Sequence, residues 1–231
     1  MELKFDVVKL NVITLIASDF KLFFYFWAMQ TTFSLQYPLI LASNSPRRKE
    51  ILGQAGFLFS VLPSDVDESF EEGLPLEEVP AVLSKRKALA ISDVHPNSLI
   101  LAADTVVILA GKILNKPATK QEAFDMLSQL SGKTHQVITG ITLKSPLGLQ
   151  TKTDAANVTF RSLAQWEIDW YVRGGSSMDK AGAYGVQDFI GMAGIANLEG
   201  SFYTVMGLPI FQVYEWLSPF ILDAKQSPIP F

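Results

Sequence analysis

Apolar and polar positions along the chain follow two periods in turn. Apolar runs at 38–43 and 98–109 predict buried strands, and an apolar position every three to four residues at 76–93 predicts an amphipathic helix. Alternating positions at 134–144 and 150–160 predict two strands paired as a long hairpin. Because strands alternate with helices early and then pair in sequence, we expect an α/β fold with a mixed twisted β-sheet flanked by helices.

Local signals place the remaining elements. Ser45 followed by Pro46 predicts a capped helix start, and Gly56 its end. Thr119 and Glu122 have the spacing of a capping box for a second helix. Further predictions are a strand at 57–62, an acidic loop at 65–75, a short strand at 112–114, a helix opened by Ser162 and Gln165 that ends at Gly174, a glycine-rich loop with a short strand at 176–207 and a closing helix at 208–222.

The helix at 76–93 has a predicted core face, and a later helix carries aromatic side chains. The core face contains Val79, Val82, Leu83 and Leu89. Trp166, Trp170 and Tyr171 recur at helical spacing, which favours core or dimer packing over stacking on a base.

Composition narrows the possible functions. The 231 residues are 48% hydrophobic and 18% charged, which suits one large α/β domain or two closely joined lobes. A net charge of −4 argues against a long nucleic acid as partner, so any polyanion should be small. The absence of cysteine excludes disulfides and thiolate sites, and the spacing of His95 and His135 does not suggest a zinc site.

The first 28 residues differ from the rest. Their apolar stretches are interrupted by charges, so we expect neither stable membrane insertion nor a signal peptide. Met29 as the true start and an amphipathic membrane-surface anchor both stay open. We divide the chain into a leader of doubtful status at 1–37, a single catalytic domain of two lobes at 38–222 and a tail at 223–231.

An anion site is predicted where the first strand meets the first helix. Free N–H groups and the helix dipole attract anions at such a turn, which here runs from Ser43 to Arg48. Arg47 and Arg48 in the first helical turn each destabilise the helix by about 0.3–1 kcal/mol, because their charge opposes the helix dipole. A bound phosphate would make the same two charges stabilising. The alternative is a solvated pair of arginines on an ordinary helix.

Carboxylates supply a second candidate. Asp104, followed by Thr105, interrupts a long apolar strand, where an ionised group needs a partner or a metal. The alternative is an aspartate that caps a turn. Glu68, in the acidic pair after the second strand, could share Mg²⁺ with Asp104.

Isolated polar residues complete the candidates. Lys87, Lys116 and Lys180 lie beside small residues or proline, although each alone is more often at the surface than in a site. Gln187 follows a glycine-rich turn and could read a base edge or a sugar, although such residues more often bind backbone.

Together these segments resemble the Maf family of nucleoside-triphosphate pyrophosphatases, from about residue 38 to residue 217. The matching pieces occur in the order of the family: Leu41-Ala42-Ser43-Asn44-Ser45-Pro46-Arg47-Arg48, Asp67-Glu68, Lys87-Ala88, Ala103-Asp104-Thr105-Val106-Val107, Lys116-Pro117, Leu130-Ser131-Gly132-Lys133-Thr134-His135, Asp179-Lys180-Ala181-Gly182-Ala183-Tyr184-Gly185-Val186-Gln187 and Gly207-Leu208-Pro209.

The resemblance implies a Maf/ITPase-like architecture, a cytoplasmic homodimer and hydrolysis of a nucleoside triphosphate between its α and β phosphates with Mg²⁺ or Mn²⁺. It implies that Asp104 accepts the proton of the attacking water and that Glu68 and Asp104 lie at the metal. It assigns substrate binding to Ser43, Arg47, Arg48, Lys87, Lys116 and Lys180, with Arg48 serving the phosphates alone.

The same resemblance bears on base choice. Arg47, Thr105 and Gln187 would set it, and Thr105 after Asp104 is similar to the branch that acts on dTTP and UTP. The branch for 7-methyl-GTP has glutamine there and is the first alternative; a nucleotide-binding regulator of cell division is the second. Phe202 and the stretch 190–195 depart from the family, and we expect them to loosen the pocket wall and lower affinity.

Overall fold

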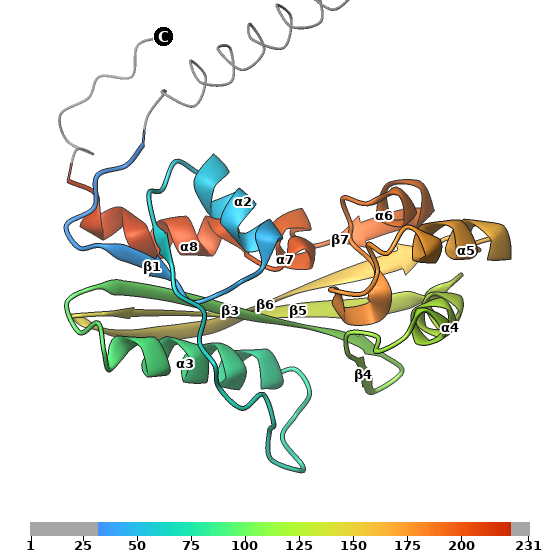
Figure 1. Cartoon of the computed structure of the whole chain (residues 1–231), viewed down its shortest axis with the longest axis horizontal. Helices are drawn as coiled ribbons and strands as arrows, with labels where there is room; N and C mark the ends of the chain where they lie inside the picture. The colour runs from blue at the N-terminus through green and yellow to red at the C-terminus, as the bar shows by residue number, and fades with distance from the viewer. Residues whose placement is uncertain (1–31, 223–231) are drawn as a thin grey trace, which may run out of the picture.

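The computed structural model describes residues 32–222 and consists of one mixed sheet with helices on both faces (Figure 1). Its strands lie in the order β2-β1-β3-β5-β6-β7, and β4 pairs with β3 outside this path. The strands are β1 (Leu39–Leu41), β2 (Ser60–Val61), β3 (Leu99–Leu109), β4 (Lys112–Leu114), β5 (Thr134–Ser145), β6 (Gly148–Phe160) and β7 (Ile195–Glu199). The pair β1–β2 and the pair β1–β3 are parallel and the other pairs are antiparallel, which confirms the mixed α/β fold.

The helices form two layers and a group beyond them. The helices are α2 (Pro46–Gln54), α3 (Val79–Ser92), α4 (Lys120–Leu130), α5 (Gln165–Arg173), α6 (Phe189–Gly194), α7 (Phe202–Met206) and α8 (Ile210–Leu217), with 3-10 turns η1 (Ala181–Ala183) and η2 (Ser218–Phe220). Figure 1 shows α3 below the sheet, α2, α7 and α8 above it, and α4, α5 and α6 together at its right-hand end.

The long hairpin is confirmed. Its register runs without a break from Thr134 opposite Thr159 to Ser145 opposite Gly148, where the chain turns. A hairpin this long runs past both groups of helices as one continuous ladder of hydrogen bonds, and the division into two lobes stays a prediction.

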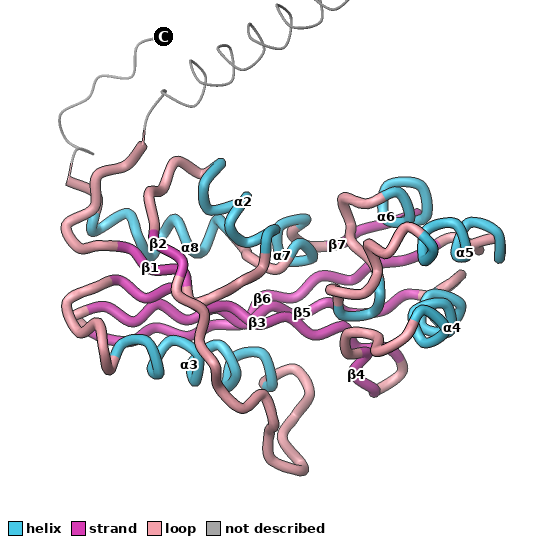
Figure 2. Tube along the Cα trace, viewed as in Figure 1, coloured by secondary structure: helices cyan, strands magenta, loops and turns pink. Residues whose placement is uncertain are grey.

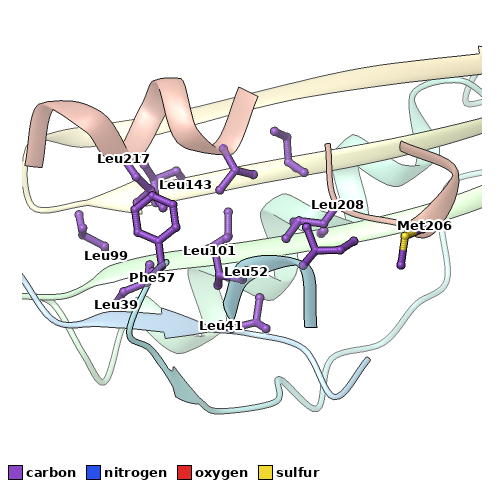
Figure 3. Packing of buried hydrophobic residues seen from close by; sticks show 14 of the residues in the cluster. Leu39, Leu41, Leu52, Phe57, Leu99, Leu101, Leu143, Met206, Leu208 and Leu217 are labelled. Atoms are coloured by element: carbon purple, nitrogen blue, oxygen red, sulfur yellow. The ribbon is translucent and has the colours of Figure 1, made fainter. Parts of the chain in front are cut away.

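Within residues 32–222, four apolar clusters fill the space between sheet and helices, and the two smaller ones lie between the sheet and α3. Of the two largest, the first packs Leu41, Leu52, Leu101 and Leu217 between the sheet and the helices above it, as Figure 3 shows. The second contains Leu127, Phe160 and Ile168, which lie between the strands and helices α4 and α5. Burial of such side chains contributes about 1.5–3 kcal/mol each, and Ile195, Leu198 and Val205 pack against both of these clusters.

Helix α3 packs very closely on the sheet because of Gly140. A Cβ atom at this position would collide with the backbone of Pro80 and Ala81. Gly140 is also the β5 residue that pairs with Asp104 of β3. The missing side chain therefore lets α3 approach the strand that carries the candidate catalytic carboxylate.

The predicted core face of α3 is only half right. Val79 and Leu83 are buried, but Val82 and Leu89 are 36% and 37% exposed. Ala88 and Ile91 complete the buried face instead. Small Ala88 replaces the larger residues because the helix lies so close to the sheet.

Two predicted caps are wrong in detail. The side chain of Ser45 makes no capping hydrogen bond; its backbone N–H instead donates to Ser43 Oγ at 3.2 Å. Helix α5 begins after Ala164, whose N–H donates to the Glu167 carboxylate, rather than at Ser162. The cap of α4 is confirmed, since Thr119 Oγ1 accepts from Glu122 N at 3.1 Å.

Residues 176–207 hold more structure than the predicted loop with one strand. They form η1, α6, β7 and α7, each of six residues or fewer. Such short elements cannot display a helical or strand period in the sequence, which explains the miss. Strand β2 is also shorter than predicted, and the closing helix gives way to η2 at Ser218, before Pro219.

The ends of the described chain pack together. Phe33 bridges to Phe57, and Leu35 bridges to Ile221, so the last residues of the predicted leader contact the domain. The proposed start at Met29, the preceding residues and the tail from 223 lie outside the described residues. Within residues 32–222, no helix is long and apolar enough to cross a membrane.

Candidate active site

A gap in the pairing of β3 places the site. Strand β1 pairs with β3 as far as Leu101, and β4 joins the same edge at Val107. Between these two points the edge carries Asp104 and Thr105, and a cavity of about 710 Å³ opens there. Since successive residues of a strand point to opposite faces, this opening lets groups from both helical layers reach one space.

All the candidate residues of the sequence line this one cavity. They are Ser43, Arg47, Arg48, Glu68, Lys87, Asp104, Thr105, Lys116, Lys180 and Gln187. Glu68 arrives on the long connection between β2 and α3, which Figure 2 shows as a loop that passes the sheet from one layer to the other.

Lys87 connects two carboxylates. Its Nζ lies 2.6 Å from Asp104 Oδ1 and 2.6 Å from Glu68 Oε1. The side chains of Lys87 and Asp104 are 11% and 13% exposed, whereas that of Glu68 is 61% exposed. The hydrogen bond from Lys87 lowers the pKa of Glu68 below its ordinary value, so both acids face the cavity with only one ammonium between them.

Arg48 is held inside the protein on all three nitrogens. Nε donates to Gly207 O at 2.8 Å, Nη1 to Ser43 Oγ at 3.2 Å and Nη2 to Thr105 Oγ1 at 3.1 Å. Burial lowers the pKa of this guanidinium, which the charge of Asp104 opposes. Arg48 therefore fixes the strand-to-helix turn against β3 and keeps positive charge beneath the cavity.

Arg47 and Lys180 meet at Asp179. Arg47 Nη1 lies 3.0 Å from Asp179 Oδ2, and Lys180 Nζ lies 2.7 Å from Asp179 Oδ1. Lys180 also contacts Ser176 O, and Asp188 Oδ2 at 3.4 Å. The ammonium of Lys180 is thus largely engaged by protein acceptors, whereas Arg47, which also lines the cavity, contacts Asp179 through Nη1.

The site can bind a small polyphosphate and activate water. Cations surround one part of the cavity, and paired carboxylates face it, a combination suited to hydrolysis of a phosphate anhydride. Glu68 and Asp104 fit a divalent cation, because both already converge on a single positive group and Mg²⁺ usually takes one or two carboxylates together with substrate phosphates. Within residues 32–222, no set of three or more acidic or histidine side chains could hold a metal alone.

Two residues of the site have no role predicted from the sequence. Asp179 was recognisable only as the neighbour of Lys180, and Asn115 only as the neighbour of Lys116; both line the cavity. Neither Phe202 nor the stretch 190–195 lines the cavity directly, but Gly191 packs against the backbone of Gly185, which does line it, so the expected loosening of the wall stays a prediction. Trp166 and Trp170 also lie outside it, and their exposure of 67% and 59% contradicts core packing, whereas Tyr171 is 3% exposed and does pack in the core.

A nucleotide-sized cavity with cations around paired carboxylates defines a protein that acts on a small phosphorylated molecule. Comparison with known proteins narrows this class. Residues 38–220 match the family described as Maf-like protein, and the chain belongs to that family.

Three curated relatives share one name. The "dTTP/UTP pyrophosphatase" of Phocaeicola vulgatus is 44% identical over 182 residues, which is 78% of this chain and 94% of the relative. The protein of the same name from Bacteroides thetaiotaomicron is 46% identical over 182 residues, with the same coverage. That of Halalkalibacterium halodurans is 46% identical over 173 residues, 75% of this chain and 90% of the relative.

Solved structures are more distant. A nucleoside-triphosphatase / dITP/XTP pyrophosphatase from Mycobacterium abscessus is 14% identical, with a TM-score of 0.34 over 55% of this chain and 75% of that one. The Ham1 protein of Staphylococcus aureus is 17% identical, with a TM-score of 0.38 over 55% of this chain and 72% of that one.

Proposed function

We propose that the protein is a nucleoside-triphosphate pyrophosphatase that hydrolyses dTTP and UTP to the monophosphate and pyrophosphate. The observation that carries this function is the group of Lys87, Glu68 and Asp104, which faces the cationic wall of one cavity. Relatives named dTTP/UTP pyrophosphatase, 44% and 46% identical, support the substrate class.

Asp104 is the proton acceptor in this proposal. Its carboxylate is held at 2.6 Å by Lys87, and Asp104 lines the cavity. Water attacks the α-phosphorus, its proton passes to Asp104, and the bond to the β-phosphate oxygen breaks. Arg47 and Lys116, which line the same cavity, stabilise the negative charge of the departing pyrophosphate.

A divalent cation, Mg²⁺ or Mn²⁺, would be held by Glu68 and Asp104 together with the substrate phosphates. When bound, it supplies positive charge that draws the phosphates toward the carboxylates and polarises the phosphoryl group. In this proposal Lys87 holds the carboxylates of Glu68 and Asp104 in place before the nucleotide binds.

The test of Asp104 is pyrophosphate release from dTTP and UTP with Mg²⁺. We expect Asp104→Asn to lower kcat by about 10³-fold, since general-base catalysis contributes about 10²–10⁴-fold. Asp125→Asn, at an exposed position of α4, is the matched control and should behave as wild type. Equal rates for Asp104→Asn and wild type would reject the catalytic role.

A substrate panel separates the two alternatives. A tenfold preference for 7-methyl-GTP over dTTP and UTP would move the protein to the other branch. A regulator of cell division that does not depend on hydrolysis would keep its division phenotype on overexpression as Asp104→Asn.

We also propose a cytoplasmic homodimer. Nucleoside triphosphates are cytoplasmic metabolites, and the exposed aromatic side chains of Trp166 and Trp170 offer an apolar surface on α5. Analytical ultracentrifugation checks the stoichiometry: Trp166→Glu with Trp170→Glu should turn a dimer into a monomer if this surface forms the contact.

A further inference from the structure

Arg48 determines the hydrogen-bonding direction of two hydroxyls in the cavity wall. A guanidinium group can only donate, so Ser43 Oγ and Thr105 Oγ1, at 3.2 Å and 3.1 Å from its Nη atoms, must both accept. Each of these hydroxyls has one proton and two lone pairs. One lone pair of each is therefore occupied by the same arginine.

Thr139 accepts a hydrogen bond from the hydroxyl of Thr105. Thr139 Oγ1 donates to the carbonyl oxygen of Thr204 at 2.7 Å, which uses its only proton. The 2.9 Å contact between Thr105 Oγ1 and Thr139 Oγ1 then requires Thr105 to be the donor. The hydrogen bonds therefore all point one way: Arg48 donates to Thr105, Thr105 to Thr139, and Thr139 to the backbone of α7.

The two cavity hydroxyls consequently have opposite polarity. Thr105 uses its proton in the hydrogen bond to Thr139 and one lone pair in the hydrogen bond from Arg48. Its remaining lone pair can only accept a hydrogen bond from a group in the cavity. Ser43 accepts from Arg48 and from Ser45 N, at 3.2 Å each, so it keeps only its proton to donate. A donating hydroxyl suits a phosphate oxygen, whereas an accepting hydroxyl suits an N–H or O–H group.

We propose that Thr139 is a positioning residue that fixes Thr105 as an acceptor, and that Thr105 thereby selects nucleotides with a hydrogen-bond donor at that point. This inference rests on the proposed function. Two groups of dTTP and UTP have the required chemistry: the imide N3–H of the base and the 3′-hydroxyl of the sugar. Cytosine carries an acceptor at N3, so Thr105 would face it lone pair to lone pair.

The buried strand β5 supplies a matched pair of variants. Thr139 and Thr142 are both 0% exposed and both bond to two partners. They lie on opposite faces of the sheet, because Thr142 contacts Ser84 of α3 and Thr139 contacts α7. Thr139→Val removes the acceptor of Thr105, so that the hydroxyl of Thr105 can donate elsewhere. Thr139→Ser keeps the series of hydrogen bonds intact. Thr142→Val controls for the loss of a buried hydroxyl.

The experiment measures Kd by calorimetry in EDTA, with UTP against CTP and dTTP against its 3′-O-methyl analogue, which keeps the 3′ oxygen as an acceptor but loses the donor. We expect Thr139→Val to lower one of the two ratios by about fivefold, the effect of one hydrogen bond. A fall in the CTP/UTP ratio assigns the donor to the base, and a fall in the other ratio assigns it to the sugar. Thr139→Ser and Thr142→Val should keep the ratios of wild type.

Unchanged ratios in Thr139→Val, or equal changes in Thr142→Val, would overturn the inference. Pyrophosphate release by wild type separates this outcome from failure of the proposed function. Release with unchanged ratios rejects the role of Thr139 alone. No release, with a ratio that still falls in Thr139→Val, rejects the hydrolase and leaves the selection by Thr105 standing.

Discussion

Lys87 in the cavity and Arg161 beside α5 both bind glutamate, but the two clusters differ in how far their charges are satisfied. Arg161 makes a two-pronged contact with Glu167, at 2.9 Å and 2.6 Å, and also donates to the carbonyl groups of Ser162 and Ala193. Lys87 instead serves two carboxylates at once, and Glu68 remains 61% exposed.

The two clusters differ in whether each charged group is fully paired by protein groups, that is, saturated, and this difference separates a structural ion pair from a functional one. Glu167 has one charge opposite one charge, and it also accepts from Ala164 N at 2.8 Å. In direct contact, the cluster in the cavity has two acids for one ammonium, and the charges of Arg48 and Lys116 act on Glu68 from further away. Such an unbalanced group is stable only with a further cation or a network around it, which is what a catalytic site provides.

The largest effect that would sharpen this comparison is on activity. Lys87→Met should lower kcat/KM for dTTP by about 10²–10³-fold, because the two carboxylates lose the group that positions them. Lys85→Met, exposed on the same helix, is the control. Arg161→Met should leave kcat/KM unchanged. If Lys87→Met and Arg161→Met alter kcat/KM equally, the distinction between the clusters is lost.

The fold was largely readable from the sequence, because long strands and helices carry their period over ten residues or more. Asp104 could also be found, since a charge inside an apolar strand is conspicuous. The hydrogen bonds by which Arg48 joins the strand-to-helix turn to β3 could not be predicted, because its partners Thr105 and Gly207 are 57 and 159 residues away in the sequence. Residue type reveals a candidate, whereas the direction of a hydrogen bond depends on folding.

His135 gives the next largest effect. It lies on β5, stacks on Phe160 and contacts Tyr184 Oη through Nε2 at 2.7 Å, and burial lowers its pKa from 6.5 to about 4. The unfolded chain therefore binds a proton more readily, so the protein should lose about 3 kcal/mol of stability as the pH falls from 6.5 to 4. Above pH 6.5 the contribution is complete.

Urea unfolding at a series of pH values measures this dependence. His135→Gln should remove most of the slope between pH 6.5 and 4, and His95→Gln, at an exposed loop position, should keep it. An identical slope in wild type and His135→Gln would show that other groups cause the acid dependence.

The smallest expected effect tests the saturated pair at a lower pH. The hydrogen bond from Arg161 lowers the pKa of Glu167 from 4.5 to about 2. A depressed carboxylate pKa gives stability that is complete above pH 4.5 and is lost between pH 4.5 and 2, a window that overlaps that of His135 only between pH 4.5 and 4. Glu167→Gln should therefore lower the Tm at pH 7 by about 4 °C and leave the Tm near pH 2 unchanged.

Asp169→Asn is the control for Glu167→Gln, since it breaks an ion pair with Arg173 that is 46% and 76% exposed. An exposed pair contributes little, so its Tm at pH 7 should stay within about 1 °C of wild type. Pyrophosphate release should be normal in both variants, because a charge that the protein already satisfies has nothing left to offer a substrate. Lost activity in Glu167→Gln with an unchanged Tm would place Glu167 in the catalytic machinery and break the rule that saturation marks a structural pair.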